Sequence, residues 1–389
     1  MEVLGVSLKL GLTSFGGPVA HLGYFRTEYV VRRHWLSEEA FADLVALCQL
    51  LPGPASSQVN MSIGMSRAGI PGAVAAWLGF TLPSAAALTA FALLLGVSGV
   101  IGSGWLHGIM LAAVGVVAQA VWAMAARLSA DARRAAITAA AAIMSLLIPL
   151  AVTQVILIAA GGVAGRLLLP GTGTSSLKAL PLQVPRAVSV ASLSLFLVLL
   201  AGLPALRVFV RLDWLALFES FYRVGSLVFG GGHVVLPLLH GEVVLPGWVS
   251  ESQFMAGYAA AQAVPGPLFT FAAYLGAVVT IHPNGLPGAL IALVAIFLPS
   301  FLLLIGVLPF WSSLRARPGF QSALSGINAA VVGLLAAALY RPVWTSSVLT
   351  VPDFCISLGA FVLLTRMNAR PWMVIALGAA AGQIVRLVS

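Results

Sequence analysis

Charge is scarce in this sequence. Only 8% of its 389 residues are Asp, Glu, Lys or Arg, whereas 60% are hydrophobic and the mean hydropathy is +1.04. Several apolar runs exceed about 18 residues, the length that favours a membrane-spanning helix. This composition excludes an ordinary soluble domain and a disordered chain. The sequence therefore predicts an all-α, polytopic membrane protein.

Cysteine is also scarce, and motifs for redox cofactors and nucleotides are absent. Cys48 and Cys355 lie far apart in apolar segments without a CxxC pair, so we expect two buried packing thiols. A membrane enzyme that reduces its substrate would need a thiol pair, a haem ligand set or a flavin motif. An ATP-driven pump would need a GxxxxGK[ST] phosphate loop and a soluble nucleotide-binding domain. We therefore expect neither an enzyme nor a cofactor.

The few charged residues are mostly basic. Of the 20 Lys and Arg residues 18 are Arg, and the net charge is +9. In a membrane protein this excess usually reports topology, because cytoplasmic loops are rich in Lys and Arg. A nucleic-acid partner is therefore not expected. Glu2 and Lys9 do not fit a cleavable signal peptide, so we expect the N-terminal segment to be retained.

The sequence contains an internal repeat at a distance of about 214 residues. Five segments recur in the same order: SFGGPVAHL (14–22) as VFGGGHVVL (228–236), WLSEEAF (35–41) as WVSESQF (248–254), QLLPGP (49–54) as QAVPGP (262–267), IPGAVAAWLGFTLPS (70–84) as LPGALIALVAIFLPS (286–300), and GIMLAAVGVV (108–117) as GINAAVVGLL (326–335). We expect a first repeat at 1–168, a linker with a connecting helix at 169–206 and a second repeat at 207–389. The number of spans between 135 and 206 stays open.

Basic residues fall on non-equivalent loops of the two repeats. In the first repeat they occur in YFRTEYVVRRHW (24–35) and RLSADARR (127–134), whereas VSGVIGSG (97–104) has no charge. In the second repeat the loop 239–248 has no Lys or Arg, while SSLRARPGF (312–320), the counterpart of the uncharged loop, carries two Arg. Equivalent loops are therefore expected on opposite sides of the membrane. The sequence predicts two inverted-topology repeats.

The stretch LLPGPASSQ (50–58) places two prolines, a glycine and three polar residues inside an apolar region. The Arg-rich loop before it and Arg67 after it are both expected to be cytoplasmic. The two arms, about 38–51 and 55–66, would be about 18 to 21 Å long as helices, too short to cross a core of about 30 Å. The sequence therefore predicts a re-entrant helical hairpin, paired with a second one at about 250–280 that enters from the opposite face.

The hairpin turns and the FGG segments are candidates for an anion site near the membrane midplane. Irregular backbone at that depth is tolerated where it lines a cavity, and a helix that begins at Ala55 would present its free amides there. The alternative is that these glycines and prolines only permit close packing and kinks. The candidate substrate-binding residues are Gly16, Gly17, Gln49, Gly53, Ser56, Ser57, Gln58, Gly230, Gly231, Gly232, Gln262 and Gly266.

The segment TSFGGPVAHLGYFRTEYVVRRHWLSEEAFADLVALCQLLPGPASSQVNMSIG (13–64) resembles the signature region of the chromate ion transporter (CHR) family, and the resemblance extends over both halves of the chain. It implies a two-domain carrier in the bacterial inner membrane that exports chromate, a divalent oxyanion, and confers chromate resistance. The matching motif residues are Phe15, Gly16, Gly17, Pro18, Gln49, Pro52, Gly53 and Pro54, echoed by Phe229, Gly230, Gly231, Gln262, Pro265, Gly266 and Pro267. Because ASSQ (55–58) becomes LFTF (268–271), the second hairpin offers fewer donors and the site is expected to be asymmetric.

Six further residues are candidates for gating, charge or coupling roles: Arg26, Glu28, Arg67, Arg223, His233 and Glu242. The two glutamates occupy equivalent positions and could carry protons or form salt bridges. The arginines offer the bidentate geometry that fits oxyanions, and the histidine could respond to pH. Interfacial solvation, topology and packing are the alternative roles.

Energetics favours secondary transport. Exporting a dianion from a cell that is negative inside gains about 4.6 kcal/mol at 100 mV, so ATP is not required. Membrane potential and proton exchange both stay open as driving forces. A sulfate or other oxyanion importer and an anion channel are the alternatives. The expected partners are chromate with sulfate as a competitor, protons and the lipid bilayer; a symmetric homodimer and a monomer both stay open.

Overall fold

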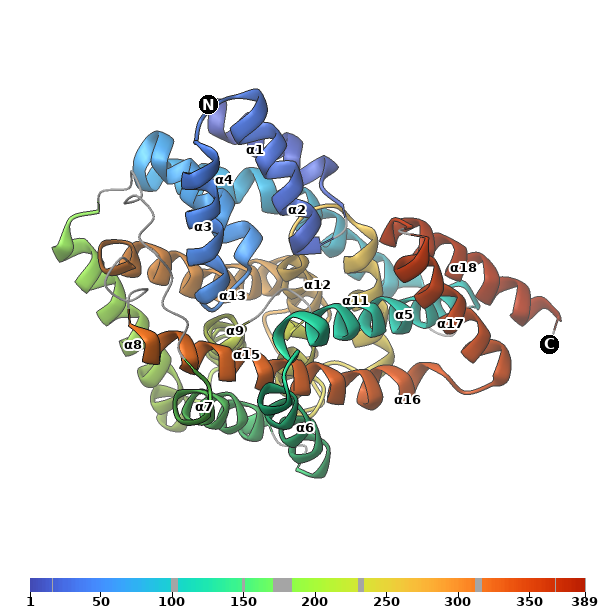
Figure 1. Ribbon diagram of the computed structural model, residues 1–389. Helices are drawn as coiled ribbons and strands as arrows, with labels where there is room; N and C mark the ends of the chain where they lie inside the picture. The colour runs from blue at the N-terminus through green and yellow to red at the C-terminus, as the bar shows by residue number, and fades with distance from the viewer. Residues whose placement is uncertain are drawn as a thin grey trace.

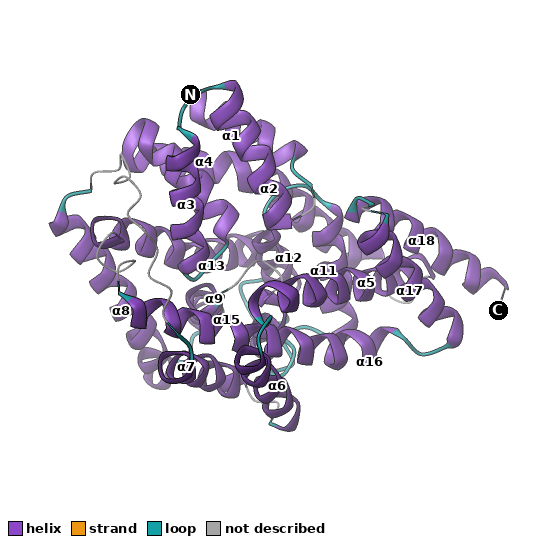
Figure 2. Cartoon of the chain, in the orientation of Figure 1, coloured by secondary structure: helices purple, strands orange, loops and turns teal. Residues whose placement is uncertain are grey.

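The computed structural model describes residues 1–15, 17–98, 104–148, 151–170, 184–229, 234–311, 317–367 and 369–388. Within these ranges every regular element is a helix (Figure 2). Five helices are long and apolar enough to cross a membrane: Ala55–Leu94, Gly104–Leu128, Arg186–Phe209, Gly285–Phe310 and Pro318–Ser347. The prediction of an all-α membrane protein is confirmed.

The first repeat contains eight described helical elements: α1 (Glu2–Thr13), α2 (Gly17–Phe25), the π-helix η1 (Arg26–Arg32), α3 (Glu38–Leu50), α4 (Ala55–Ser98), α5 (Gly104–Leu128), α6 (Ala132–Leu147) and α7 (Ala151–Leu168). Helix α8 (Arg186–Phe209) connects the repeats. The second repeat contains α9 (Asp213–Leu227), α10 (Val235–Val243), α11 (Glu251–Ala263), η3 (Leu268–Thr270), α12 (Phe271–Val278), α13 (Gly285–Val307), η4 (Leu308–Phe310), α15 (Pro318–Ala338), η5 (Leu339–Trp344), α16 (Thr345–Ser347), α17 (Val351–Arg366) and α18 (Pro371–Val388).

The short helices predicted for the two hairpins are present. Helix α3 ends at Leu50 and α4 begins at Ala55, with the PGP turn between them. Helix α4 bends sharply at Ala68 and Gly69, so its first part is a short arm that ends close to the predicted residue 66. In the second repeat α11 and α12 flank the equivalent turn. Their depth in a bilayer, and the inverted orientation of the repeats, stay predictions.

The two repeats exchange their C-terminal helix pairs. Helix α5 of the first repeat packs against α17 and α18 of the second, whereas α15 of the second packs against α6 and α7 of the first (Figure 1). Glycines permit both approaches: a Cβ atom on Gly378 would lie 2.7 Å from the Gly108 carbonyl oxygen, and one on Gly161 would lie 2.9 Å from that of Gly326. Each repeat therefore needs the other to complete its helix packing.

The segment 135–168 contains two helices, α6 and α7, on either side of residues that lie outside the described ranges. The prediction of two buried cysteines is half right, since Cys48 is buried and Cys355 is exposed. The buried stripe of α17 includes Asp353, Ser357 and Ala360, at helical spacing, and Cys355 falls off that stripe.

Candidate functional site

Each PGP turn is centred on a glycine that other residues cannot easily replace. Gly53 has a φ of +118° and Gly266 a φ of +102°. Residues with a Cβ atom rarely adopt such angles. The flanking prolines disfavour helix in the residues before them, so the chain stops being helical here and starts again after the turn.

Each turn is held by the broken helix of the other repeat. The Gly53 amide donates a hydrogen bond of 2.7 Å to the Val228 carbonyl, and the Gly266 amide donates one of 3.0 Å to the Ser14 carbonyl. Ser14 directly follows α1 and Val228 directly follows α9, each at the start of an FGG segment. The four motif segments therefore form two reciprocal contacts between the repeats.

A serine from the other repeat lies beside each turn as well. Ser300 in α13 lies so close to Gly53 that a Cβ atom there would clash with its hydroxyl. Ser84 in α4, the equivalent position, has its hydroxyl 2.8 Å from where a Cβ atom on Gly266 would lie. Both serines are buried. The turns thus approach hydroxyl groups so closely that only glycine fits.

Buried polar atoms without a protein partner surround these contacts. In the described part of the chain, five such atoms lie on residues of this region: Ser14 Oγ, His21 Nε2, Ser57 Oγ, Gln58 Oε1 and Ser300 Oγ. Buried polar atoms are nearly always hydrogen-bonded in native proteins, so a cluster of free ones indicates a place for water or a ligand. All but one of these residues belong to the first repeat.

His21 connects the surroundings of the two turns. Its Nδ1 lies 3.3 Å from the hydroxyl of Ser56, which follows the Gly53 turn. Its ring packs edge-on against Phe80 at 5.4 Å, and the Phe80 carbonyl lies 3.3 Å from where a Cβ atom on Gly266 would be. The polar cluster therefore extends from one turn towards the other.

The twelve predicted binding residues divide into three groups and one separate residue, Gly17. Gly53, Gly266, Ser56, Ser57 and Gln58 lie at or beside the turns, and Gln58 Nε2 donates to the Pro52 carbonyl at 2.7 Å. Gly17 begins α2 with a φ of +75°.

The second group lies in the helices that lead into the turns. Gln49 is exposed on α3 and makes no recorded hydrogen bond to the turn, while Gln262 is half-buried and hydrogen-bonds with Tyr258. The third group, the glycines Gly16, Gly230, Gly231 and Gly232, lies outside the described residues, as does the coupling candidate His233.

Two of the charged candidates of the first repeat, Glu28 and Arg26, form ion pairs, and the third, Arg67, lies over an aromatic ring. Glu28 is buried and receives bonds from Lys9 at 3.1 Å and Arg33 at 2.9 Å, with Arg32 at 3.4 Å. Arg26 forms an exposed pair with Glu38. The Arg67 guanidinium lies 5.0 Å from the centre of the Trp35 ring.

The second repeat has an equivalent cluster with fewer cations, since in the first Arg33 and Glu2 form a further pair at 2.9 Å. Arg223 binds Glu242 at 2.7 Å and Glu219 at 2.9 Å, and Arg207 binds Glu219 at 2.9 Å. Arg223 corresponds to Lys9 and Glu242 to Glu28 in the repeat alignment, so one ion pair is duplicated. Glu219 corresponds to Gly5 and has no acidic counterpart.

The two equivalent glutamates differ in their pKa because their neighbours differ. Both lie outside the long apolar spans. Burial alone would raise the pKa of Glu28, but hydrogen bonds from Arg33 and Lys9 more than offset it, and the pKa lies below the ordinary value. Burial raises the pKa of Glu242, Arg223 opposes the rise only in part, and the carboxylate of Glu219 adds to it. Glu242 is thus the carboxyl group better suited to take up a proton.

Sequence reasoning missed several residues of this arrangement. Ser84 and Ser300 end a pair of matched segments, and Lys9 matches Arg223, so the repeat alignment contained a signal for all three. His21 matches Val235 and therefore has no duplicate to mark it. Their contacts with the turns and the glutamates depend on how the repeats pack together.

The fold and the site together define a class: an all-helical, multi-pass membrane protein in which two copies of a broken helix and a PGP turn meet. A family model described as chromate transporter matches residues 1–166 and 215–383. The chain belongs to the chromate transporter family. The five apolar helices and this family support a multi-pass protein of the bacterial inner membrane.

Individual relatives agree with the family match. A probable chromate transport protein of Synechococcus elongatus is 28% identical over 97% of this chain and 93% of its own length. A chromate transport protein of Pseudomonas aeruginosa is 31% identical over 85% of this chain and 78% of its own length. A chromate transport protein of Cupriavidus metallidurans is 27% identical over 96% of this chain and 90% of its own length. No solved structure shows a significant match to the chain.

Proposed function

We propose that this protein exports chromate from the cell by secondary transport, with the anion bound between the two PGP turns. The observation that carries the proposal is the pair of reciprocal hydrogen bonds, Gly53 to Val228 and Gly266 to Ser14, beside a cluster of unpartnered polar atoms. The names of the relatives supply the substrate.

The chemistry of the cluster fits a tetrahedral oxyanion. Helix α4 begins at Ala55, so its first free amides and its positive dipole end face the region beside the Gly53 turn. The hydroxyls of Ser57 and Ser300 and the His21 ring add donors that the protein itself does not use. An anion held by neutral donors leaves without the cost of breaking a salt bridge, which suits a carrier.

The reciprocal contacts also suit alternating access. Each turn is fixed to the other repeat through one main-chain hydrogen bond, so a movement of one repeat against the other changes both turns together. The export of a dianion driven by 100 mV gains about 4.6 kcal/mol. Membrane potential would then supply most of the driving force.

Proton exchange is the second driving force that we propose, through Glu242. Its raised pKa and the shared cation Arg223 mean that one proton relieves the repulsion between Glu242 and Glu219. Glu28 also shares a cation, since Arg33 pairs with Glu2, but hydrogen bonds from Arg33 and Lys9 lower its pKa, so it is less suited to take up a proton.

Uptake of labelled chromate into proteoliposomes that contain the purified protein tests the function. We expect saturable flux that increases with an imposed potential and that excess sulfate reduces. Flux that does not saturate would indicate a channel. Sulfate flux faster than chromate flux would indicate a sulfate carrier, and absence of any anion flux would contradict the proposal.

A further inference from the structure

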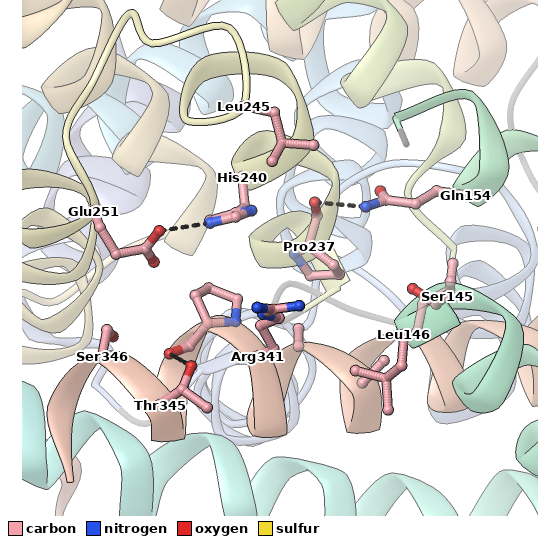
Figure 3. A pocket seen from close by; sticks show the side chains of 14 residues that line it. Ser145, Leu146, Gln154, Pro237, His240, Leu245, Glu251, Arg341, Thr345 and Ser346 are labelled. Carbon is pink, nitrogen blue, oxygen red and sulfur yellow. Dashed lines mark hydrogen bonds and ion pairs between the residues drawn. The ribbon is translucent and has the colours of Figure 1, made fainter. Parts of the chain in front are cut away.

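A polar cavity lies between the two repeats, and none of the PGP turn residues lines it. It has a volume of about 430 Å³, within the range of small-molecule sites. Helices from both repeats line it, since α6 and α7 contribute side chains together with α10, α11, α15, η5 and α16 (Figure 3). Its polar lining includes Ser145, Gln154, His240, Glu251, Arg341 and Ser346.

Arg341 is the cation of this cavity that no group in the described part of the chain neutralises. The structure records no ion pair or hydrogen bond for its side chain among those residues. Figure 3 shows it in the middle of the lining side chains, with the His240 and Glu251 pair on one side and Ser145 on the other. Helix η5, which follows α15, breaks at Arg341, whose extended backbone precedes Pro342.

Two further groups belong to the same polar lining. The Ser346 hydroxyl is buried and has no partner in the described part of the chain. His240 lies 3.0 Å from Glu251, so its Nε2 is shared with an acid that is partly exposed. Gln154 and Thr345 are already satisfied, by the carbonyls of Pro237 and Pro342 respectively.

The equivalent surface of the first repeat lacks this cation. His240 corresponds to Arg26 and Glu251 to Glu38, which also form a pair. Arg341 corresponds to Ala123. The duplicated acid–base pair is therefore a shared feature of the two repeats, whereas the free guanidinium is an addition of the second repeat alone.

We propose that this cavity is a second oxyanion site, in which Arg341 and the Ser346 hydroxyl bind a tetrahedral dianion. The inference rests on the proposed function for its role in transport. The cavity includes the 239–248 loop, which is predicted to be periplasmic, so the exported anion would reach it after it leaves the turns. A cavity of this size holds such an anion together with several waters of about 30 Å³ each. The carboxylate of Glu251 competes with the anion for His240 and limits its affinity.

Equilibrium binding of labelled sulfate to the purified full-length chain tests the site without requiring transport. We expect two binding events in the unmodified protein. Arg341→Gln should weaken one of them about tenfold, because a hydrogen-bonded charge is lost, whereas Arg341→Lys should weaken it less. Glu251→Gln should strengthen the same event, a change that misfolding cannot imitate. Gly53→Leu should remove the other event.

Arg366→Gln is the matched control, since Arg366 is exposed like Arg341 but ends α17, a helix that contributes no residue to the cavity lining. Its binding should equal that of the unmodified protein. Identical binding in Arg341→Gln and the unmodified protein would overturn the inference. Loss of one event in Arg341→Gln with no effect of Gly53→Leu would support the cavity and count against the site at the turns.

Discussion

The two PGP turns share their backbone conformation but differ in the side chains directly after them. After Gly53 come Ser56, Ser57 and Gln58, all buried and polar, whereas the equivalent residues after Gly266 are Phe269, Thr270 and Phe271, also buried. In the first repeat two of the three positions carry a polar atom without a partner. In the second, the one polar side chain, that of Thr270, donates to the Pro267 carbonyl. The difference indicates that the first repeat supplies most of the hydrogen-bond donors for an anion. The side chains after the second turn instead serve packing and the turn's own hydrogen bond.

The two ion-pair clusters also differ, but here the second repeat, and not the first, has the features that suit a functional role. The buried carboxylate of Glu28 has three cationic neighbours, whereas Glu219 and Glu242 share Arg223 and have Arg207 besides. The first cluster is electrostatically saturated and suits a structural role. The second has one cation fewer for its two acids and suits proton uptake. Duplication thus preserved the geometry while the chemistry of the copies diverged.

The largest expected effect comes from the feature that the repeats share. Gly53→Leu and Gly266→Leu should each reduce chromate flux to the level of empty liposomes, because a side chain would clash with Ser300 or Ser84 and break the contact with the other repeat. Gly247→Leu and Gly285→Leu are matched controls, since both glycines also have positive φ but no atom lies within 4 Å of a Cβ atom there. Equal flux in all four variants would show that the turns are not involved.

The next effect should separate the two turns. Ser57→Ala should raise the KM for chromate about tenfold, because a hydroxyl without a protein partner is lost to the anion. Thr270→Val, at the equivalent position, should change KM less than about twofold, because its hydroxyl already bonds to Pro267. Kinetics in proteoliposomes measure both. A larger effect of Thr270→Val would reverse the division between the repeats.

Replacement of Glu242 should change the pH dependence of chromate flux, an effect of several-fold. As pH falls towards the raised pKa of Glu242 this group gains a proton, whereas Glu28, with a lowered pKa, stays ionised. Flux measured from about pH 8 to about pH 5 should therefore lose its pH dependence in Glu242→Gln and keep it in Glu28→Gln. The reverse result would assign coupling to the first repeat.

The smallest effect concerns the caps of the two hairpin helices. Ser37 caps α3 through the Ala40 amide, and Ser250 caps α11 in a reciprocal arrangement with Gln253. Ser37→Ala and Ser250→Ala should each cost about 1 kcal/mol of unfolding free energy, with the larger loss for Ser250, whose hydroxyl accepts from the Gln253 amide and also donates to Gln253 Oε1. Thermal unfolding of both variants in detergent shows which of them loses more stability. An equal or larger loss for Ser37 would contradict it.

Local chemistry made much of the fold predictable. Prolines and glycines end helices for reasons that act within a few residues, so the helix start at Ala55 and the breaks before residues 15 and 229 followed from the sequence. The spacing of equivalent segments identified the repeats in the same way. Whether Gln49 would face the turn was harder to foresee. It lies off the stripe of Leu44, Leu47 and Cys48, which helical periodicity buries.

Contacts between the repeats could not be predicted from the sequence. The repeat alignment pairs Gly53 with Gly266, but it does not say that each glycine contacts the other repeat's broken helix. The same holds for α5 and α15, whose partners are exchanged. Such contacts depend on how two complete repeats pack, which no local preference encodes. The role of His21 depends on this packing too.

The position of bound chromate is the most direct measurement. Crystals of the full-length chain grown with chromate would locate chromium by its anomalous scattering. We predict a peak between the turns, with anion oxygens within about 3.2 Å of Ser57, Ser300 or His21. A peak in the Arg341 cavity alone, or at no place near Gly53 and Gly266, would contradict the claim that the reciprocal turns bind the transported anion.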